Sequence, residues 1–247
     1  MLNLDFLQCP KTSKSLFLWP NKEINDIFER VSKADVFQMR KSNKSSEIVK
    51  YFIKQNDFGI TDLKKICNKE WLNDMVIECY LEMLIKRREN FKLFGNCFYD
   101  YQHDKIKYNR SNFFEKTPTV EIVFIPIYLR NHWVLGVAVK KEKKILFYDS
   151  LGDGRPKEYM RTITNHLNSG KEKGWSFKVV PKSECPQQTN GFDCGVFILK
   201  IAESIVKGTP LKYVHQKYMQ YYRAKMILEF EEEAKVHAIA ERTINLD

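Results

Sequence analysis

The chain has 247 residues, of which 43% are hydrophobic and 29% are charged, so it can form one sizeable domain with an apolar core. Its net charge is +10, but the basic residues are scattered and accompany no zinc-finger, phosphate-loop or RNA-binding motif, which argues against nucleic acid as the main partner. The sequence has no apolar run that could cross a membrane, no secretory signal at its start and no C-x-x-C pair among its six cysteines, so we expect an intracellular protein with free thiols and neither a metal nor a cofactor.

The beginning of the chain is expected to be a tail, covering residues 1–16. Residues 17–231 are predicted to form a single domain, within which 21–31 is a short helix and 45–55 is a short helical or extended segment. Residues 232–247 are predicted to be a C-terminal helical extension.

An amphipathic helix is predicted over residues 73–88. Apolar side chains recur there at helical spacing: Val76, Ile77, Tyr80, Leu81, Leu84 and Ile85. Asn73 is a suitable N-cap, and Asp74 lies in the first turn, where a negative charge is favoured.

The middle of the chain has the β-branched, apolar composition of strands. Strands are predicted at 120–127, 132–139 and 145–149, followed by a helix at 157–168 and another strand at 176–180. Helices are predicted at 194–207, ended by Gly208-Thr209-Pro210, and within 213–242. The acidic run at 229–233 is expected to be a solvated face. The expected fold class is α+β, with a mixed or antiparallel central sheet flanked by helices.

Cys194 lies in Asp193-Cys194-Gly195, at the predicted start of an apolar helix. A helix N-terminus stabilises an anion and therefore favours a thiolate, and Gly195 is expected to leave room for a substrate backbone. These three residues alone fit a buried cysteine without chemistry better than a nucleophile. Cys185 is expected to be a buried, inert thiol.

His132 changes that balance, because it begins one predicted strand while Asp149 ends the next. An antiparallel hairpin brings these two positions to the same end of the sheet, where a carboxylate can orient an imidazole. Gln188, six residues before Cys194, could donate its amide to an oxyanion; an ordinary polar loop is the alternative.

These segments together resemble the Ulp/SENP family of SUMO-specific cysteine proteases, which have a papain-like architecture of the ubiquitin-like protease type. The resemblance rests on Trp71-Leu72-Asn73-Asp74, His132-Trp133, Tyr148-Asp149-Ser150, the run PQQTNGFDCG from Pro186 to Gly195, and residues 216–230. The order His, Asp, Gln, Cys matches this family, whereas papain-type proteases place the cysteine first.

The resemblance implies a role for each matching residue. Cys194 would attack the carbonyl of the modifier's last glycine, His132 would act as base and then acid, Asp149 would orient it, and Gln188 would help to hold the oxyanion.

Three further residues are implied to bind the substrate. Trp71 and Trp133 would clamp the Gly-Gly tail, and Asp74 would pair with a basic side chain of the modifier. Trp71 could instead be a core tryptophan.

The function that this resemblance implies is cleavage after the C-terminal Gly-Gly of SUMO, in deconjugation from lysines and in precursor processing. The implied partners are SUMO and its conjugates, and no nucleic acid is required. The protein is expected to be a monomer in the nucleus, at the nuclear envelope or in the cytoplasm. The alternatives are the same chemistry on NEDD8 or ubiquitin, an acyltransferase, and an inactive modifier-binding module.

Overall fold

The structure is a computed structural model that describes residues 60–95, 98–152 and 154–244, with side chains described up to residue 236. The predicted tail at 1–16 and the predicted segments at 21–31 and 45–55 lie outside the described residues. One helix runs through the predicted boundary between residues 231 and 232.

A five-stranded mixed sheet forms the centre of the protein, in the order β1-β4-β5-β6-β7. The outer pairs β1–β4 and β6–β7 are parallel, whereas β4–β5 and β5–β6 are antiparallel. The strands are β1 (Phe91–Leu93), β4 (Ile122–Leu129), β5 (His132–Val139), β6 (Lys144–Tyr148) and β7 (Ser176–Val179). A separate short hairpin consists of β2 (Tyr99–Asp100) and β3 (Lys105–Ile106).

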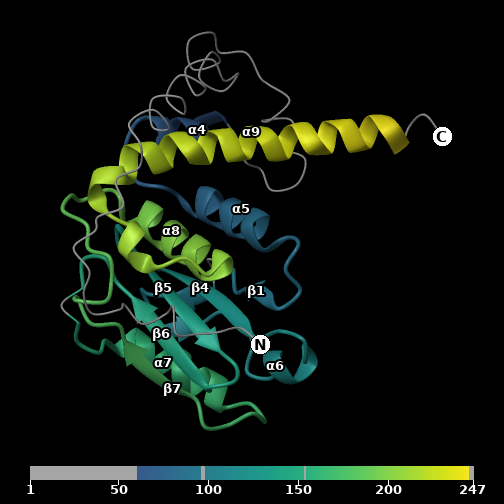
Figure 1. Cartoon of the computed structure of the whole chain (residues 1–247). Coiled ribbons are helices and arrows are strands. Elements are labelled where there is room, and N and C mark those ends of the chain that lie inside the picture. Colours follow the sequence, from purple (N-terminus) through teal and green to yellow (C-terminus); the bar gives the residue numbers. More distant parts are fainter. Residues whose placement is uncertain (1–59, 96–97, 153, 245–247) are drawn as a thin grey trace.

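Helices cover both faces of this sheet, as Figure 1 shows. The helices are α4 (Ile60–Cys67), α5 (Asp74–Ile85), α6 (Phe113–Lys116), α7 (Glu158–Asn168), α8 (Cys194–Lys207) and α9 (Met219–Ile244). Two 3₁₀ turns, η2 (Leu211–Tyr213) and η3 (Gln216–Tyr218), connect α8 to α9. The predicted α+β class is therefore confirmed.

Alternate residues of β5 divide the core into two layers, because successive side chains of a strand point to opposite faces. Trp133, Leu135 and Val137 pack with α4, α5, α8 and α9. Val134 and Ala138 pack on the other face with α6 and α7. The sheet is thus buried on both sides, and its ends remain available for a site.

The two helices nearest the site have clear beginnings and ends. Asn73 caps α5, as predicted, by accepting a hydrogen bond from the Val76 N–H at 3.2 Å. Every residue of α8 from Cys194 to Val206 is buried, and Gly208 ends the helix in the left-handed region at φ 66°. No described helix combines the length and apolarity that a membrane span needs.

Candidate active site

His132 and Asp149 meet at one end of the sheet. Strand β5 begins at His132 and antiparallel β6 ends at Tyr148, so Asp149 follows directly beside the imidazole. His132 Nε2 lies 2.7 Å from Asp149 Oδ1, and the Leu151 N–H donates to the same oxygen at 3.0 Å. The turn after β6 therefore fixes the carboxylate, and the carboxylate fixes the ring.

The electrostatics of His132 favour its protonated form. Burial lowers the pKa of His132, but the hydrogen bond to Asp149 and the neighbouring Cys194 outweigh it and raise the pKa to about 9. The second ring nitrogen, Nδ1, is buried and bonds to no nitrogen or oxygen of the described part of the chain. Nδ1 is the nitrogen that remains for the thiol.

Cys194 is the first residue of α8 and is only 2% exposed. The prediction that the next residue, Gly195, leaves room for a substrate backbone is wrong. A Cβ at Gly195 would lie 2.9 Å from Leu72 Cβ and 3.2 Å from Ile77 Cδ1. The glycine therefore lets α8 pack closely against the segment before α5, which lines the same site.

Gln188 is buried and held on both sides of its amide. Its Oε1 accepts from Ser150 Oγ at 2.6 Å, and its Nε2 donates to the Asn190 carbonyl at 2.6 Å. Since a side-chain amide has two N–H bonds, one remains for another acceptor. The Ser150 contact could not be read from the sequence, although Ser150 adjoins Asp149.

Cys185 lies next to the Asp149 backbone and does not line the groove that leads to Cys194. It is buried, its Sγ is 3.6 Å from the Asp149 carbonyl oxygen, and burial raises the pKa of its thiol to about 12. The expectation of a buried thiol is confirmed, and the raised pKa disfavours the reactive thiolate.

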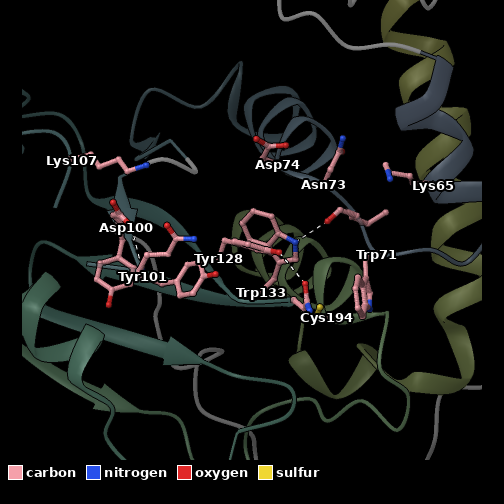
Figure 2. Close-up of a pocket in the computed structure, with 14 residues that line it drawn as sticks. Lys65, Trp71, Asn73, Asp74, Asp100, Tyr101, Lys107, Tyr128, Trp133 and Cys194 are labelled. Carbon is pink, nitrogen blue, oxygen red and sulfur yellow. Dashed lines mark hydrogen bonds between the residues drawn. The ribbon is translucent and has the colours of Figure 1, made fainter. Parts of the chain in front are cut away.

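A groove of about 540 Å³ leads to Cys194, and Figure 2 shows the side chains around it. In this view the thiol lies between the indoles of Trp71 and Trp133. The Trp133 Nε1–H donates to the Leu72 carbonyl at 2.8 Å and is buried, whereas Trp71 is 49% exposed. The alternative of a core tryptophan at position 71 is therefore wrong.

The groove extends beyond the residues that the sequence indicated. Asp74 lines it, and beyond Trp133 the groove continues past Tyr128 to Tyr101 and Asp100. The Tyr128 and Trp133 rings are 5.1 Å apart, between their centroids. Neither tyrosine could be identified from the sequence, because an aromatic residue near a strand end gives no sign of which groove it faces.

Comparison with known proteins identifies the fold and the family. A family model described as the Ulp1 protease family, C-terminal catalytic domain, matches residues 70–238, which include all the site residues above. The chain belongs to the Ulp1 protease family. The predicted resemblance is thereby confirmed.

Curated members of the Ulp1 family show moderate identity. Putative ubiquitin-like-specific protease 1B of Arabidopsis thaliana is 29% identical, over 77% of this chain and 62% of that relative. Sentrin-specific protease 2 of Homo sapiens is 30% identical, over 68% of this chain and 31% of that relative. The chain thus spans less than two thirds of the length of these relatives.

Solved structures of Ulp1-type domains share the fold. The C-terminal Ulp1 protease domain in complex with Smt3, the yeast ortholog of SUMO, matches with a TM-score of 0.60 and 19% identity, covering 90% of this chain and 99% of that one. The catalytic domain of the Chaetomium thermophilum Ulp1-like SUMO protease matches with a TM-score of 0.57 and 16% identity, over 88% of this chain and 90% of that domain.

Proposed function

We propose that this Ulp1-family chain is a cysteine protease that hydrolyses the bond after the C-terminal Gly-Gly of SUMO. The observation that carries the proposal is the His132–Asp149 pair beside a buried cysteine, in a groove that two indoles also line. The products would be free SUMO and either a target lysine or a short precursor peptide.

The proposed chemistry assigns one role to each polar group. The Cys194 thiolate attacks the terminal glycine carbonyl, while protonated His132 stabilises the thiolate and then gives its proton to the leaving amine. His132, now neutral, takes a proton from water, which attacks the thioester and releases the glycine carboxylate and the thiol. Asp149 keeps the imidazole oriented throughout.

The oxyanion would form where α8 begins. The backbone N–H at Cys194 and the unused N–H of the Gln188 amide are the proposed donors, and the Ser150 contact holds that amide in place before substrate arrives.

Substrate selection would occur in the groove, between the two indoles. Trp71 and Trp133 would leave space for glycine but not for a larger residue, which accounts for selection of a Gly-Gly tail. Asp74, exposed at the edge of the groove, would attract a basic side chain of the modifier. Tyr128 and Tyr101 extend the apolar surface along which the tail would lie.

SUMO is proposed ahead of NEDD8 and ubiquitin because the relatives carry the names of sentrin-specific proteases and the Ulp1 domain was solved with Smt3. The indole pair argues against an acyltransferase, and the complete polar set argues against an inactive module. We further propose that the protein is a monomer in the nucleus or at the nuclear envelope and that it does not require nucleic acid.

A direct test compares SUMO, NEDD8 and ubiquitin, each carrying a C-terminal fluorophore, as substrates of the full chain. We expect kcat/KM for SUMO to exceed both others by at least about tenfold, and Cys194→Ala to abolish turnover of all three. A higher kcat/KM for NEDD8 or ubiquitin would overturn the SUMO assignment, and turnover by the alanine variant would overturn the nucleophile.

A further inference from the structure

One buried arginine on α9 contacts the residue directly before the nucleophile. Arg223 is 3% exposed, and its Nε and Nη2 donate to Asp193 Oδ1 at 2.9 and 2.8 Å. Nη2 also donates to the Phe192 carbonyl at 3.3 Å. Two N–H bonds from one planar guanidinium thus converge on a single carboxylate oxygen, and such charge-assisted bonds hold the carboxylate in place.

The same guanidinium also holds the segment that leads to Trp71. Nη2 donates to the Glu70 carbonyl at 3.0 Å, and Nη1 donates to the carbonyls of Lys65 and Ile66 at 3.2 and 3.3 Å. Glu70 immediately precedes Trp71. A single planar group therefore connects the segment that ends at the exposed indole with the segment that ends at the cysteine.

The second carboxylate oxygen of Asp193 strengthens this connection. Oδ2 accepts from Asn190 Nδ2 at 2.7 Å and from Gln216 Nε2 at 2.8 Å, while Gln216 Oε1 accepts from the Thr189 N–H at 2.9 Å. Asp193 occupies the N-cap position of α8 but makes no side-chain capping bond to that helix. Its carboxylate instead anchors the loop before α8 to the C-terminal part of the domain.

The groove wall and this loop are also bonded to each other. The Trp71 Nε1–H donates to the Gly191 carbonyl, inside the loop that Asp193 anchors. About half of the Trp71 side chain is exposed, so the protein packs against only part of the indole. The position of the indole relative to the thiol therefore depends on the bonds made by Arg223.

We propose that Arg223 is a positioning residue, which fixes the position of Trp71 relative to Cys194 through its bonds to Glu70 and Asp193. Gln216 supports it from the neighbouring 3₁₀ turn. The effect would be on turnover, because misplacement of reacting groups by about 1 Å can cost roughly 10²-fold in rate. If the ion pair served folding alone, any variant that stays folded would keep the rate of the unaltered protein.

The test uses conservative variants with matched controls in the full chain. Arg223→Lys keeps the charge but loses the planar fork, and Gln216→Ala removes only the support. The controls are Arg161→Lys, whose side chain is 57% exposed on α7, and Gln220→Ala, which is exposed on α9. Thermal unfolding first establishes that each variant is folded at the assay temperature.

Turnover of SUMO with a C-terminal fluorophore is then measured. We expect Arg223→Lys to lower kcat by about 10- to 100-fold and Gln216→Ala by a smaller factor, with KM changing less than kcat and both controls within about twofold. Should Arg223→Lys fail to fold, Gln216→Ala decides: a kcat within about twofold of the unaltered protein overturns the proposal.

A substrate-free measurement separates this proposal from the proposed function on which the turnover assay rests. The rate of Cys194 alkylation by iodoacetamide, followed by peptide mass spectrometry, should fall several-fold in Arg223→Lys because the thiol is no longer held beside His132. That fall would support the positioning role even if no Gly-Gly modifier were cleaved. A folded variant with unchanged alkylation and unchanged kcat would overturn it.

Discussion

The turn after β6 packs so closely on Asp149 that a single added methyl group should disable the site. A Cβ at Gly152 would lie 2.7 Å from Asp149 Cγ and 2.8 Å from its Cβ and Oδ2. The φ angle of Gly152 is outside the left-handed region, so Gly152→Ala introduces a steric clash without backbone strain.

The size of the effect follows from these distances. Carbon atoms in contact prefer a separation of about 3.5–4.0 Å, so the carboxylate must retreat by roughly 1 Å. The hydrogen bond that Asp149 accepts from His132 is 2.7 Å long, and a movement of that size away from the ring would break it. We expect kcat/KM to fall by about 10²-fold and the unfolding free energy by about 1–3 kcal/mol.

The assay is hydrolysis of SUMO carrying a C-terminal fluorophore, with the pKa of His132 measured by NMR in the same variant. Because the bond to Asp149 raises that pKa, Gly152→Ala should lower it from about 9 toward 6.5. Leu151→Ala is the control, since its 50% exposed side chain lies in the same turn and its N–H still reaches Asp149. A kcat/KM within twofold of the unaltered protein would show that the added methyl group does not displace Asp149.

Three other perturbations test His132, Trp133 and Gln188. The folded-state pKa of His132 is raised from 6.5 to about 9, so protonation of His132 stabilises the folded protein. This contribution is on the order of 3 kcal/mol; it is complete below pH 6.5 and is lost as pH rises through 9. Urea unfolding at pH 6 and pH 9.5 should show this loss, and Asp149→Asn should reduce it; an equal loss in that variant would contradict the assignment. Trp133→Ala should lower kcat/KM for a substrate with a Gly-Gly tail and should also reduce the ratio of kcat/KM for Gly-Gly over Ala-Ala. An unchanged ratio would exclude Trp133 from substrate selection. Gln188→Ala should lower kcat by about 10²–10³-fold, the usual cost of one oxyanion donor, and an unchanged kcat would exclude it from that role.

The parts of the fold with strong periodicity could be predicted from the sequence. Helix α8 begins at Cys194 and ends at Lys207 as predicted, and β5 begins at His132 as predicted. The proximity of His132 and Asp149 followed from hairpin geometry alone. Long apolar elements determine their own boundaries, and the ends of neighbouring antiparallel strands meet without knowledge of the rest of the fold.

Short elements and distant contacts could not be predicted. Strands β2 and β3 have two residues each, too few for a recognisable alternation, yet Tyr99 and Asp100 line the groove. Strand β1 pairs in parallel with β4, and such pairing leaves no local turn signal in the sequence.

Charged residues on α9 show the same limitation. The acidic run at 229–233 predicts a solvated face, but Glu231 is 7% exposed, and Glu229 accepts a hydrogen bond from the buried Tyr80 hydroxyl at 2.7 Å. That expectation is wrong at these two positions. Arg223, on the same helix, is also buried. Its burial could not be predicted, because only the packed structure shows which polar side chains face inward.

The central claim is that Cys194 attacks the terminal glycine carbonyl of SUMO. Its most direct test is incubation of the full chain with SUMO whose C-terminal carboxyl carries an electrophile, followed by proteolysis and mass spectrometry of the conjugate. We expect a covalent bond to the Cys194 sulfur, no bond to the buried Cys185, and slower capture by His132→Ala. Capture at any other cysteine, or capture of an equivalent ubiquitin or NEDD8 probe but not of SUMO, would contradict it.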